Sequence, residues 1–344
     1  VHDLKHLDHA RSTIGTIVSG LRHRRDRGVA PFTVLACDNL PANGHTLRGL
    51  VVRFAELVAP DLGRWVADEV RFPSTMVDRI VPATTDADRA AVAAALGVED
   101  AWPIVTEPFT QWVVEDDFPL GRPAWETVGV EFVRDVAPYE LMKLRLLNGS
   151  HSTLSYLGYL MGHETVAAAM GEPALAALIE HLMRDESAPT LPALSVDLAA
   201  YRRDLLARFR NPALKHRTWQ IAMDGSQKLP QRLLGTIRDR LRIGAPIDRL
   251  ALGVAAWMRY VTGRDETGAA IDVRDPLAGR LRAIADAAGL DAARLAPALA
   301  AVGEVFGADL PADPRFMAAV ETALDRLLRL GARATVEAVV KEAG

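Results

Sequence analysis

The sequence predicts an α/β part followed by an all-α part, and two observations lead to this division. Up to about residue 137, short β-branched or aromatic runs alternate with helical patterns. After Pro138 the strand patterns nearly vanish, and segments rich in Leu, Ala and Arg repeat apolar residues every three or four positions. For 344 residues we expect two domains, at residues 1–137 and 138–344.

Five runs in the first part have the composition of strands and are bounded by turn-forming residues. They cover residues 32–37, 76–81, 104–106, 111–115 and 130–133. The helical patterns between them cover residues 11–27, 44–70 and 86–96. In the second part, helical patterns cover residues 138–148, 152–170, 173–185, 196–209, 212–222, 229–242, 246–262, 275–288, 291–305 and 313–343.

The composition is that of a folded globular chain, with 49% hydrophobic and 24% charged residues and one cysteine. This excludes a disordered, collagen-like or disulfide-stapled protein. The net charge of −4 is spread without a basic stripe, which argues against a nucleic-acid partner. No apolar run approaches the roughly 20 residues that cross a bilayer, and the lone Cys37 suits a reducing compartment. We therefore expect a cytoplasmic protein with no membrane partner.

Arginine predominates among the 40 basic residues, of which only five are lysines. The lysines are Lys5, Lys143, Lys215, Lys228 and Lys341. Burial can bring the pKa of an ammonium group toward neutrality, whereas a guanidinium group stays charged. Each lysine is therefore a candidate for a role that arginine could not fill.

The segment 138–151 carries the strongest candidate for catalysis. It is apolar on most of its circumference, so we expect a buried helix from which Lys143 enters a cleft. On an α-helix, Asn148 lies about 140° and His151 about 80° from Lys143. These groups suit alcohol–ketone interconversion, with the amine taking the hydroxyl proton, the amide stabilising the alkoxide and the imidazole orienting the substrate. Alternatively, Lys143 extends to solvent, Asn148 ends the helix and His151 caps the next one.

Two predicted strands carry further polar candidates. Asp38 and Asn39 follow the first strand, and Asp78 and Arg79 lie within the second. Ligand contacts in α/β domains commonly lie at strand ends. An Asx turn at the first pair and a simple ion pair at the second are the alternatives.

A polar, glycine-broken stretch at 216–230 interrupts the helical part and includes Gln220 and Lys228. It is a candidate substrate loop, or else a helix end with exposed polar residues. No cluster of His, Asp or Glu has the spacing of a metal site. No strand is followed by G-x-G-x-x-G, so either no nucleotide is used or its phosphate-binding turn lies outside this chain.

Five stretches now stand out, in a fixed order along the chain. They are Cys37–Gly44, Phe72–Ile80, Glu107–Trp112, Lys143–His151 and Gln220–Lys228. Together they resemble the long-chain, metal-independent polyol and sugar-acid dehydrogenases, the family of mannitol 2-dehydrogenase and fructuronate reductase. The resemblance implies a Rossmann-type NAD-binding domain at 1–137, a helical catalytic domain at 138–344, and direct hydride transfer between NAD and a sugar acid or polyol.

The same resemblance implies roles in the helical domain. Lys143 would be the general base, Asn148 would stabilise the oxyanion, and His151 would contact the substrate. Gln220 and Lys228 would contact the far end of the sugar chain. Mannitol-oxidising members tend to carry Arg where Gln220 stands, so we expect interconversion of fructuronate and D-mannonate. Mannitol 2-dehydrogenase activity is the alternative, and a non-catalytic sugar-binding protein is a second one.

In the nucleotide domain, the resemblance implies that Asn39, Val77 and Asp78 line the nicotinamide and the reacting carbon. The resemblance to the family begins at Val1, at a position that already lies inside the nucleotide domain. We therefore expect the N-terminal part of the Rossmann domain to be missing, and the chain to bind NAD(H) weakly or not at all. The choice between NAD and NADP stays open, and we expect a monomer or a small homo-oligomer.

Overall fold

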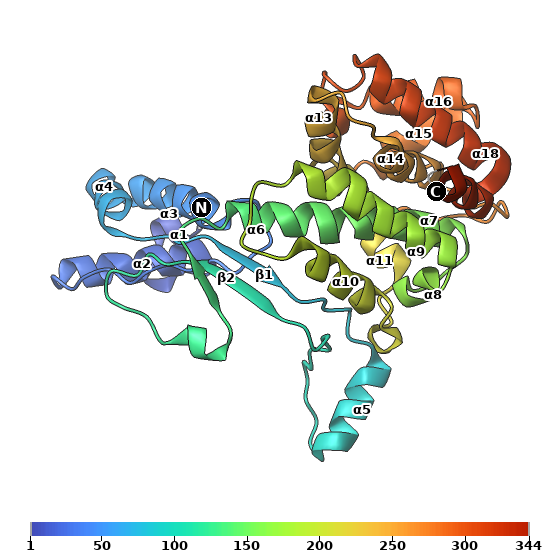
Figure 1. Cartoon of the computed structure of the whole chain (residues 1–344). Helices are drawn as coiled ribbons and strands as arrows, with labels where there is room; N and C mark the ends of the chain where they lie inside the picture. The colour runs from blue at the N-terminus through green and yellow to red at the C-terminus, as the bar shows by residue number, and fades with distance from the viewer. Residues whose placement is uncertain (1, 343–344) are drawn as a thin grey trace. The chain divides into compact units, whose positions relative to one another are not determined.

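The computed structural model describes residues 2–342, which form two compact units (Figure 1). The first unit contains the residues up to 79 together with 108–140. The second contains residues 80–107 together with those from 141 onward. The chain thus passes between the units three times, and the segment 80–107 belongs with the helices although it precedes Pro138. The division into domains at 1–137 and 138–344 stays a prediction.

Helices in the first unit cover a small core of aliphatic side chains around Val18, Leu21 and Val51. They are α1 (His2–Lys5), α2 (Thr13–Asp26), α3 (Asn43–Val58) and α4 (Pro60–Glu69). The helix predicted at 44–70 is therefore two helices. The break falls at Pro60, which begins α4, because Ala59 before it adopts the extended backbone that a following proline favours.

The sheet of the first unit has three short strands in the order β1-β2-β3. Strand β1 (Thr75–Asp78) pairs antiparallel with β2 (Gln111–Glu115), which pairs parallel with β3 (Glu131–Val133). The prediction for 111–115 is confirmed, and those for 76–81 and 130–133 are correct in place but too long. Asp78 is the last residue of β1 and pairs with Gln111 of β2.

Two predicted strands are not strands in the structure. The run at 32–37 is irregular, although the Val34 amide donates to the Arg71 carbonyl at 3.0 Å. The run at 104–106 is irregular too. Both have β-branched or aromatic composition, but strand identity depends on a ladder of backbone pairs that composition does not encode.

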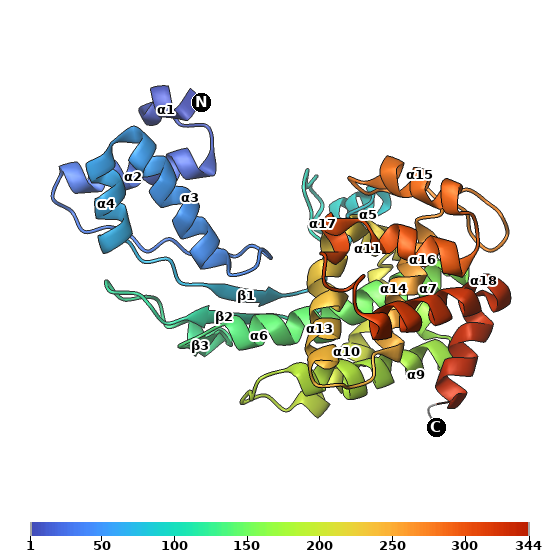
Figure 2. The ribbon, with the colours of Figure 1, turned by 90° about the horizontal axis from the view of Figure 1, so that it is seen from above.

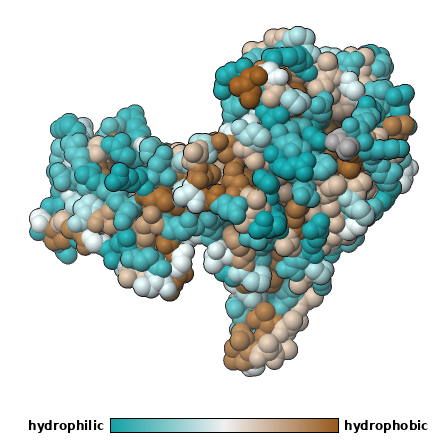
Figure 3. Space-filling model, viewed as in Figure 1, coloured by the Kyte–Doolittle hydropathy of each residue, from teal (hydrophilic) through white to brown (hydrophobic). Residues whose placement is uncertain are grey.

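The segment 80–107 joins the helical unit through a buried ion pair. Glu107 accepts two hydrogen bonds from the Arg208 guanidinium, at 2.9 and 2.7 Å, and a third from the Ile80 amide at 2.6 Å. Between these ends lies α5 (Asp86–Leu96), which begins with a Thr85–Asp88 capping box. Helix α5 buries none of its residues, and apolar side chains gather at its far end (Figures 1 and 3).

The helical unit is built around α7 (Gly149–Leu160) and α14 (Asp248–Tyr260), which pack against each other. Both are buried along nearly their whole length, as expected of helices at the centre of a core. The surrounding α-helices are α6 (Ala137–Met142, which begins in the first unit), α8 (Val166–Met170), α9 (Pro173–His181), α10 (Leu198–Phe209), α11 (Thr218–Ala222), α12 (Gly225–Leu229), α13 (Gly235–Arg242), α15 (Ala278–Ala288), α16 (Ala292–Ala300), α17 (Gly303–Phe306) and α18 (Pro314–Glu342).

Helix α18 packs along α14 and bends before its end (Figure 2). The bend is at Gly331, whose φ of 79° lies in the left-handed region that favours glycine. The helix predicted at 313–343 is therefore two helical limbs joined at this glycine, with Gly344 and its neighbour outside the described residues.

Three helical stretches have π geometry, in which backbone hydrogen bonds span five residues instead of four. They are η3 (Lys143–Asn148), η4 (Leu182–Ser187) and η7 (Pro230–Leu234). Such turns are rare and occur frequently at functional sites. The first of them, η3, packs against both η7 and η4.

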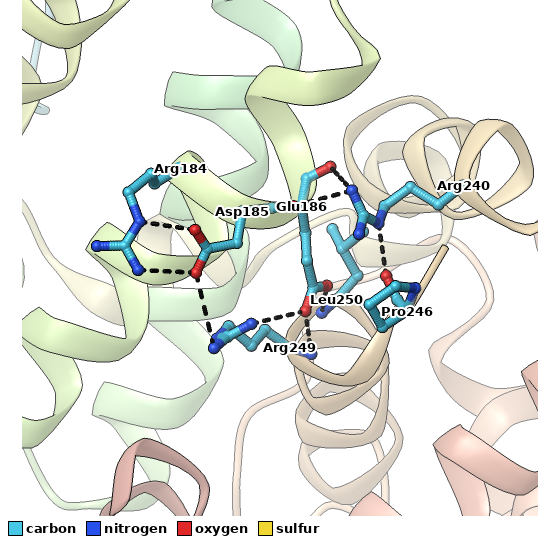
Figure 4. A network of polar contacts seen from close by, with 7 residues as sticks. All are labelled: Arg184, Asp185, Glu186, Arg240, Pro246, Arg249 and Leu250. Carbon is cyan, nitrogen blue, oxygen red and sulfur yellow. Dashed lines mark hydrogen bonds and ion pairs between the residues drawn. The ribbon is translucent and has the colours of Figure 1, made fainter. Parts of the chain in front are cut away.

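The third π turn, η4, carries a buried carboxylate that caps another helix (Figure 4). Glu186 is 1% exposed and accepts hydrogen bonds from the Arg249 and Leu250 amides, at 3.0 and 2.9 Å, in the first turn of α14. The Arg249 guanidinium adds a contact at 3.3 Å. Burial raises the pKa of Glu186, and these donors oppose that rise. Glu186 therefore satisfies orphan amides at the start of the central helix.

Candidate functional site

Lys143 and Asn148 stand at the two ends of the π turn η3, which continues α6 directly into α7. Lys143 is 9% exposed, and Asn148 is partly buried. The apolar neighbours Met142, Leu146 and Leu147 pack into the core and hold the turn in place. The structure therefore has no helix end at Asn148, contrary to the alternative in which Asn148 and Gly149 terminate the helix.

The π geometry changes the angular relation between these two groups. The Gly149 amide donates to the Leu144 carbonyl, five residues back, as in a π-helix. With five residues between bonded positions, Asn148 lies about one turn above Lys143 rather than about 140° around the axis. The predicted angle of about 140° was too large because it assumed α-helical spacing. The amine and the amide are thus on one side of the turn.

The second π turn, η7, approaches η3 at Gly149. A Cβ on Gly149 would lie 2.8 Å from the backbone oxygen of Arg232, closer than real Cβ atoms come to a backbone atom. Glycine is therefore required here for close approach of two backbones, not for an unusual φ. This contact fixes the position of Asn148, the residue before Gly149, against the helix that follows Lys228.

We expect Gly149→Ala to lower the free energy of unfolding by about 1–3 kcal/mol, because the new methyl group forces the two π turns apart. Displacement of Asn148 should also lower turnover by about tenfold or more. Chemical denaturation and steady-state kinetics measure the two effects. Gly279→Ala is the control, since a Cβ there meets no atom within 4 Å. Equal behaviour of the two variants would contradict the close-approach argument.

His151 follows three residues after Asn148, in the first turn of α7, and is 5% exposed. Its ring stacks on Phe209 at 4.4 Å between centroids and meets the edge of His216 at 5.5 Å. Burial lowers the pKa of His151 well below its usual value, and it lowers that of His216 to about 4. Both imidazoles are therefore neutral at pH 7, so His151 can act as a hydrogen-bonding group but not as a cation.

The stretch predicted as a substrate loop is two short helices, α11 and α12, separated at Met223 and Asp224. Asp224 has a φ of 55°, and a Cβ on Gly225 would collide with Tyr156 and Trp257. These constraints set the direction of α12, which carries Lys228. Gln220, on α11, is partly buried.

Lys228 is a partly desolvated cation. Its Nζ donates to the Ile221 carbonyl at 3.3 Å. Burial, with a contribution from Arg232, lowers the pKa of Lys228 to about 8, while Asp224 and Asp275 act in the opposite direction. The ammonium is therefore mostly charged at pH 7 and loses its proton as the pH rises through about 8 instead of 10.5.

In the first unit, Asn39 follows the extended segment that ends at Asp38, and its side chain is exposed. The buried Asn43 side chain holds this segment: its Nδ2 donates to the Asp38 carbonyl at 2.8 Å and to the Thr75 carbonyl at 2.9 Å. The Thr75 amide in turn donates to Asn43 Oδ1 at 2.9 Å. Asn39 is therefore tied to the strand that carries Val77 and, at its end, the buried Asp78.

The structure groups the eight candidates by unit. The residues Lys143, Asn148, His151, Gln220 and Lys228 belong to the helical unit, and Asn39, Val77 and Asp78 belong to the first unit. Within residues 2–342, no group of three or more His, Cys, Asp or Glu side chains is placed to hold a metal ion. Over the same residues, no helix is both long and apolar enough to span a membrane.

Sequence reasoning missed Arg232, which lies within η7. Its Nη1 donates to Ser152 Oγ on α7 at 3.2 Å, and burial lowers its pKa. The available signal was weak, because an Arg beside Gln231 in a helical pattern is normally read as a solvent-facing residue.

Two family models match the chain in order. The mannitol dehydrogenase Rossmann domain matches residues 7–127, and the mannitol dehydrogenase C-terminal domain matches residues 135–328. The oxidoreductase YeiQ of Escherichia coli K12 is 52% identical over 332 residues, which are 96% of this chain and 68% of that protein. The D-mannonate oxidoreductase of the same organism is 49% identical over 340 residues, 98% of this chain and 69% of that protein.

Among solved structures, the ternary complex of Pseudomonas fluorescens mannitol 2-dehydrogenase with NAD and D-mannitol is similar, with a TM-score of 0.86 and 41% identity. The match covers 99% of this chain and 69% of that one. The Rossmann-model match to residues 7–127 does not bear out the expectation that the N-terminal part of that domain is missing.

Proposed function

Because this chain belongs to the mannitol dehydrogenase family, we propose that it interconverts fructuronate and D-mannonate with NAD as the hydride carrier. The family matches confirm the predicted fold class, an α/β nucleotide-binding part with a helical part after it. They also confirm the prediction of an NAD-dependent oxidoreductase acting on a polyol or sugar acid. The particular substrate, the site residues, the cytoplasmic location and the oligomeric state remain predictions.

The observation that supports the proposed mechanism is the π turn, in which Lys143 and Asn148 stand five residues apart, about one turn along the helix. Lys143 takes the proton from the substrate hydroxyl as the carbonyl forms, and Asn148 donates a hydrogen bond to the developing alkoxide. Neutral His151 orients the same oxygen without adding charge. In the reverse direction Lys143 returns the proton.

The residues of the first unit fit a nicotinamide cofactor. The exposed Asn39 amide is held in place through Asn43, and amide groups suit the polar groups of a nicotinamide nucleotide. NAD, when bound, supplies the hydride acceptor. Asn39, Val77 and Asp78 are the residues that would hold its nicotinamide end.

A sugar acid is favoured over a neutral polyol by two features. Gln220 stands where mannitol-oxidising members tend to carry Arg, and the D-mannonate oxidoreductase of E. coli is 49% identical to this chain. Mannitol 2-dehydrogenase activity is the second candidate, supported by the 41% identity and TM-score of 0.86 to the Pseudomonas enzyme.

The test is to assay the protein with NADH against fructuronate and against fructose. We expect kcat/KM for fructuronate to exceed that for fructose at least a hundredfold. In the reverse direction, we expect the protein to oxidise D-mannonate with NAD. A preference for fructose would support the mannitol 2-dehydrogenase alternative. Turnover of neither compound would overturn both assignments.

A further inference from the structure

Arg232 and Lys228 are two cations four residues apart on the same continuous helix, formed by α12 and η7. The Arg232 guanidinium reaches α7, where it donates to Ser152 Oγ at 3.2 Å. Ser152 is the residue after His151, the candidate substrate contact. Arg232 is therefore beside the part of α7 that the proposed function places at the substrate.

These two cations have neither the carboxylate partner that Arg208 and Arg249 have nor the several backbone carbonyls that receive the buried Arg240 and Arg259. Arg208 is bound by Glu107 at 2.7 Å and Arg249 by Glu186 at 3.3 Å. Over residues 2–342, no carboxylate forms an ion pair with Lys228 or Arg232. The acidic groups that influence Lys228 most are Asp224 and Asp275, and Asp275 is engaged by the Ser226 amide and hydroxyl at 2.7 and 2.6 Å.

Desolvated cations without counter-charges are costly unless an anion binds to them. Burial lowers the pKa of both Lys228 and Arg232, and the opposing influence of Asp224 and Asp275 on Lys228 is smaller than the effect of burial. Ser152 occupies one donor of the guanidinium, and the remaining donors of its planar fork match the geometry of a carboxylate. A neutral polyol would leave both charges unmatched.

We infer that Arg232 is a specificity-determining residue that binds, with Lys228, the carboxylate of a sugar-acid substrate. The inference rests on the proposed function, because it names the substrate group that the same site selects. It adds Arg232 to the candidate site and gives the fructuronate preference a physical cause.

The test compares Arg232→Gln with the unchanged protein in kinetics on D-mannonate and on D-mannitol, with NAD. We expect the KM for D-mannonate to rise at least tenfold and the KM for D-mannitol to change less than twofold. Arg232→Lys keeps the positive charge but not the planar guanidinium group. In this variant the KM for D-mannonate should rise by a smaller factor, and the KM for D-mannitol should not rise. Arg242→Gln is the matched control, because Arg242 is exposed and pairs with Asp239.

Equal rises for both substrates, or no rise, would overturn the inference. If Arg232→Gln does not fold, Arg232→Lys provides the test. A KM that rises equally for D-mannonate and D-mannitol in that variant would also overturn the inference. Isothermal titration of D-mannonate and D-mannitol separates this inference from the proposed function. Tighter binding of the acid, lost in the Arg232 variants, would support the carboxylate site even if neither compound is turned over.

Discussion

Lys143→Ala is expected to lower kcat at least a hundredfold, a loss of about 2.7 kcal/mol of transition-state stabilisation, while the protein keeps its fold. Lys143 is 9% exposed at the start of a π turn, and alanine suits that helical position. The loss comes from removing the group that takes the hydroxyl proton. Steady-state kinetics with NAD and the preferred substrate measure it, and far-UV circular dichroism checks the fold.

Lys341→Ala is the matched control, because Lys341 is an exposed lysine near the end of α18. Its kinetics should equal those of the unchanged protein. Near-normal turnover of Lys143→Ala would refute the assignment of Lys143 as the base. An equal loss of kcat in both variants would point to a general effect of lowering the basic charge.

Glu186→Gln is expected to cost about 3 kcal/mol in the free energy of unfolding. The amide keeps the shape of the carboxylate but removes the negative charge that binds Arg249 and caps the first turn of α14 (Figure 4). Arg249 would then keep only its longer contact with Asp185, at 3.7 Å, and the cap at the start of the central helix would be weaker. Urea denaturation at pH 7 measures the change.

Glu304→Gln provides the comparison, since Glu304 pairs with Arg280 on the surface. Exposed ion pairs contribute little, so this variant should unfold like the unchanged protein. Similar midpoints for both Glu variants would show that the Glu186 network does not hold α14.

The helices were largely predictable from sequence because their apolar period reflects burial on one face. The prediction for 86–96 coincides with α5 although this helix buries none of its residues, because its alanine-rich sequence has high helix propensity and its Thr85–Asp88 capping box is visible in the sequence. The strand predicted at 32–37 is wrong, because a strand requires a ladder of backbone hydrogen bonds to another segment, and the bond from Val34 to Arg71 does not form a ladder. The break at Pro60 was missed although the proline itself marks it.

For the candidate site, the residue types were predictable but not their geometry. An amine, an amide and an imidazole were recognisable near each other in the sequence, yet the angle between Lys143 and Asn148 was not. Leu144, Leu146 and Leu147 fit an α-turn and a π turn equally well in sequence, so hydrophobic period could not reveal the extra residue. Arg232 escaped notice because its burial arises from packing against α7, which is distant in sequence.

The π turn at Lys143–Asn148 also limits how this segment can vary during evolution. A substitution of one leucine by another aliphatic residue leaves the backbone path intact, whereas deletion of one residue would restore an α-helix and rotate the two functional groups relative to each other by about 100°. Insertions and deletions should therefore be excluded between these positions even where side chains vary. We therefore expect the length of this short stretch to be retained as strictly as the two residues at its ends.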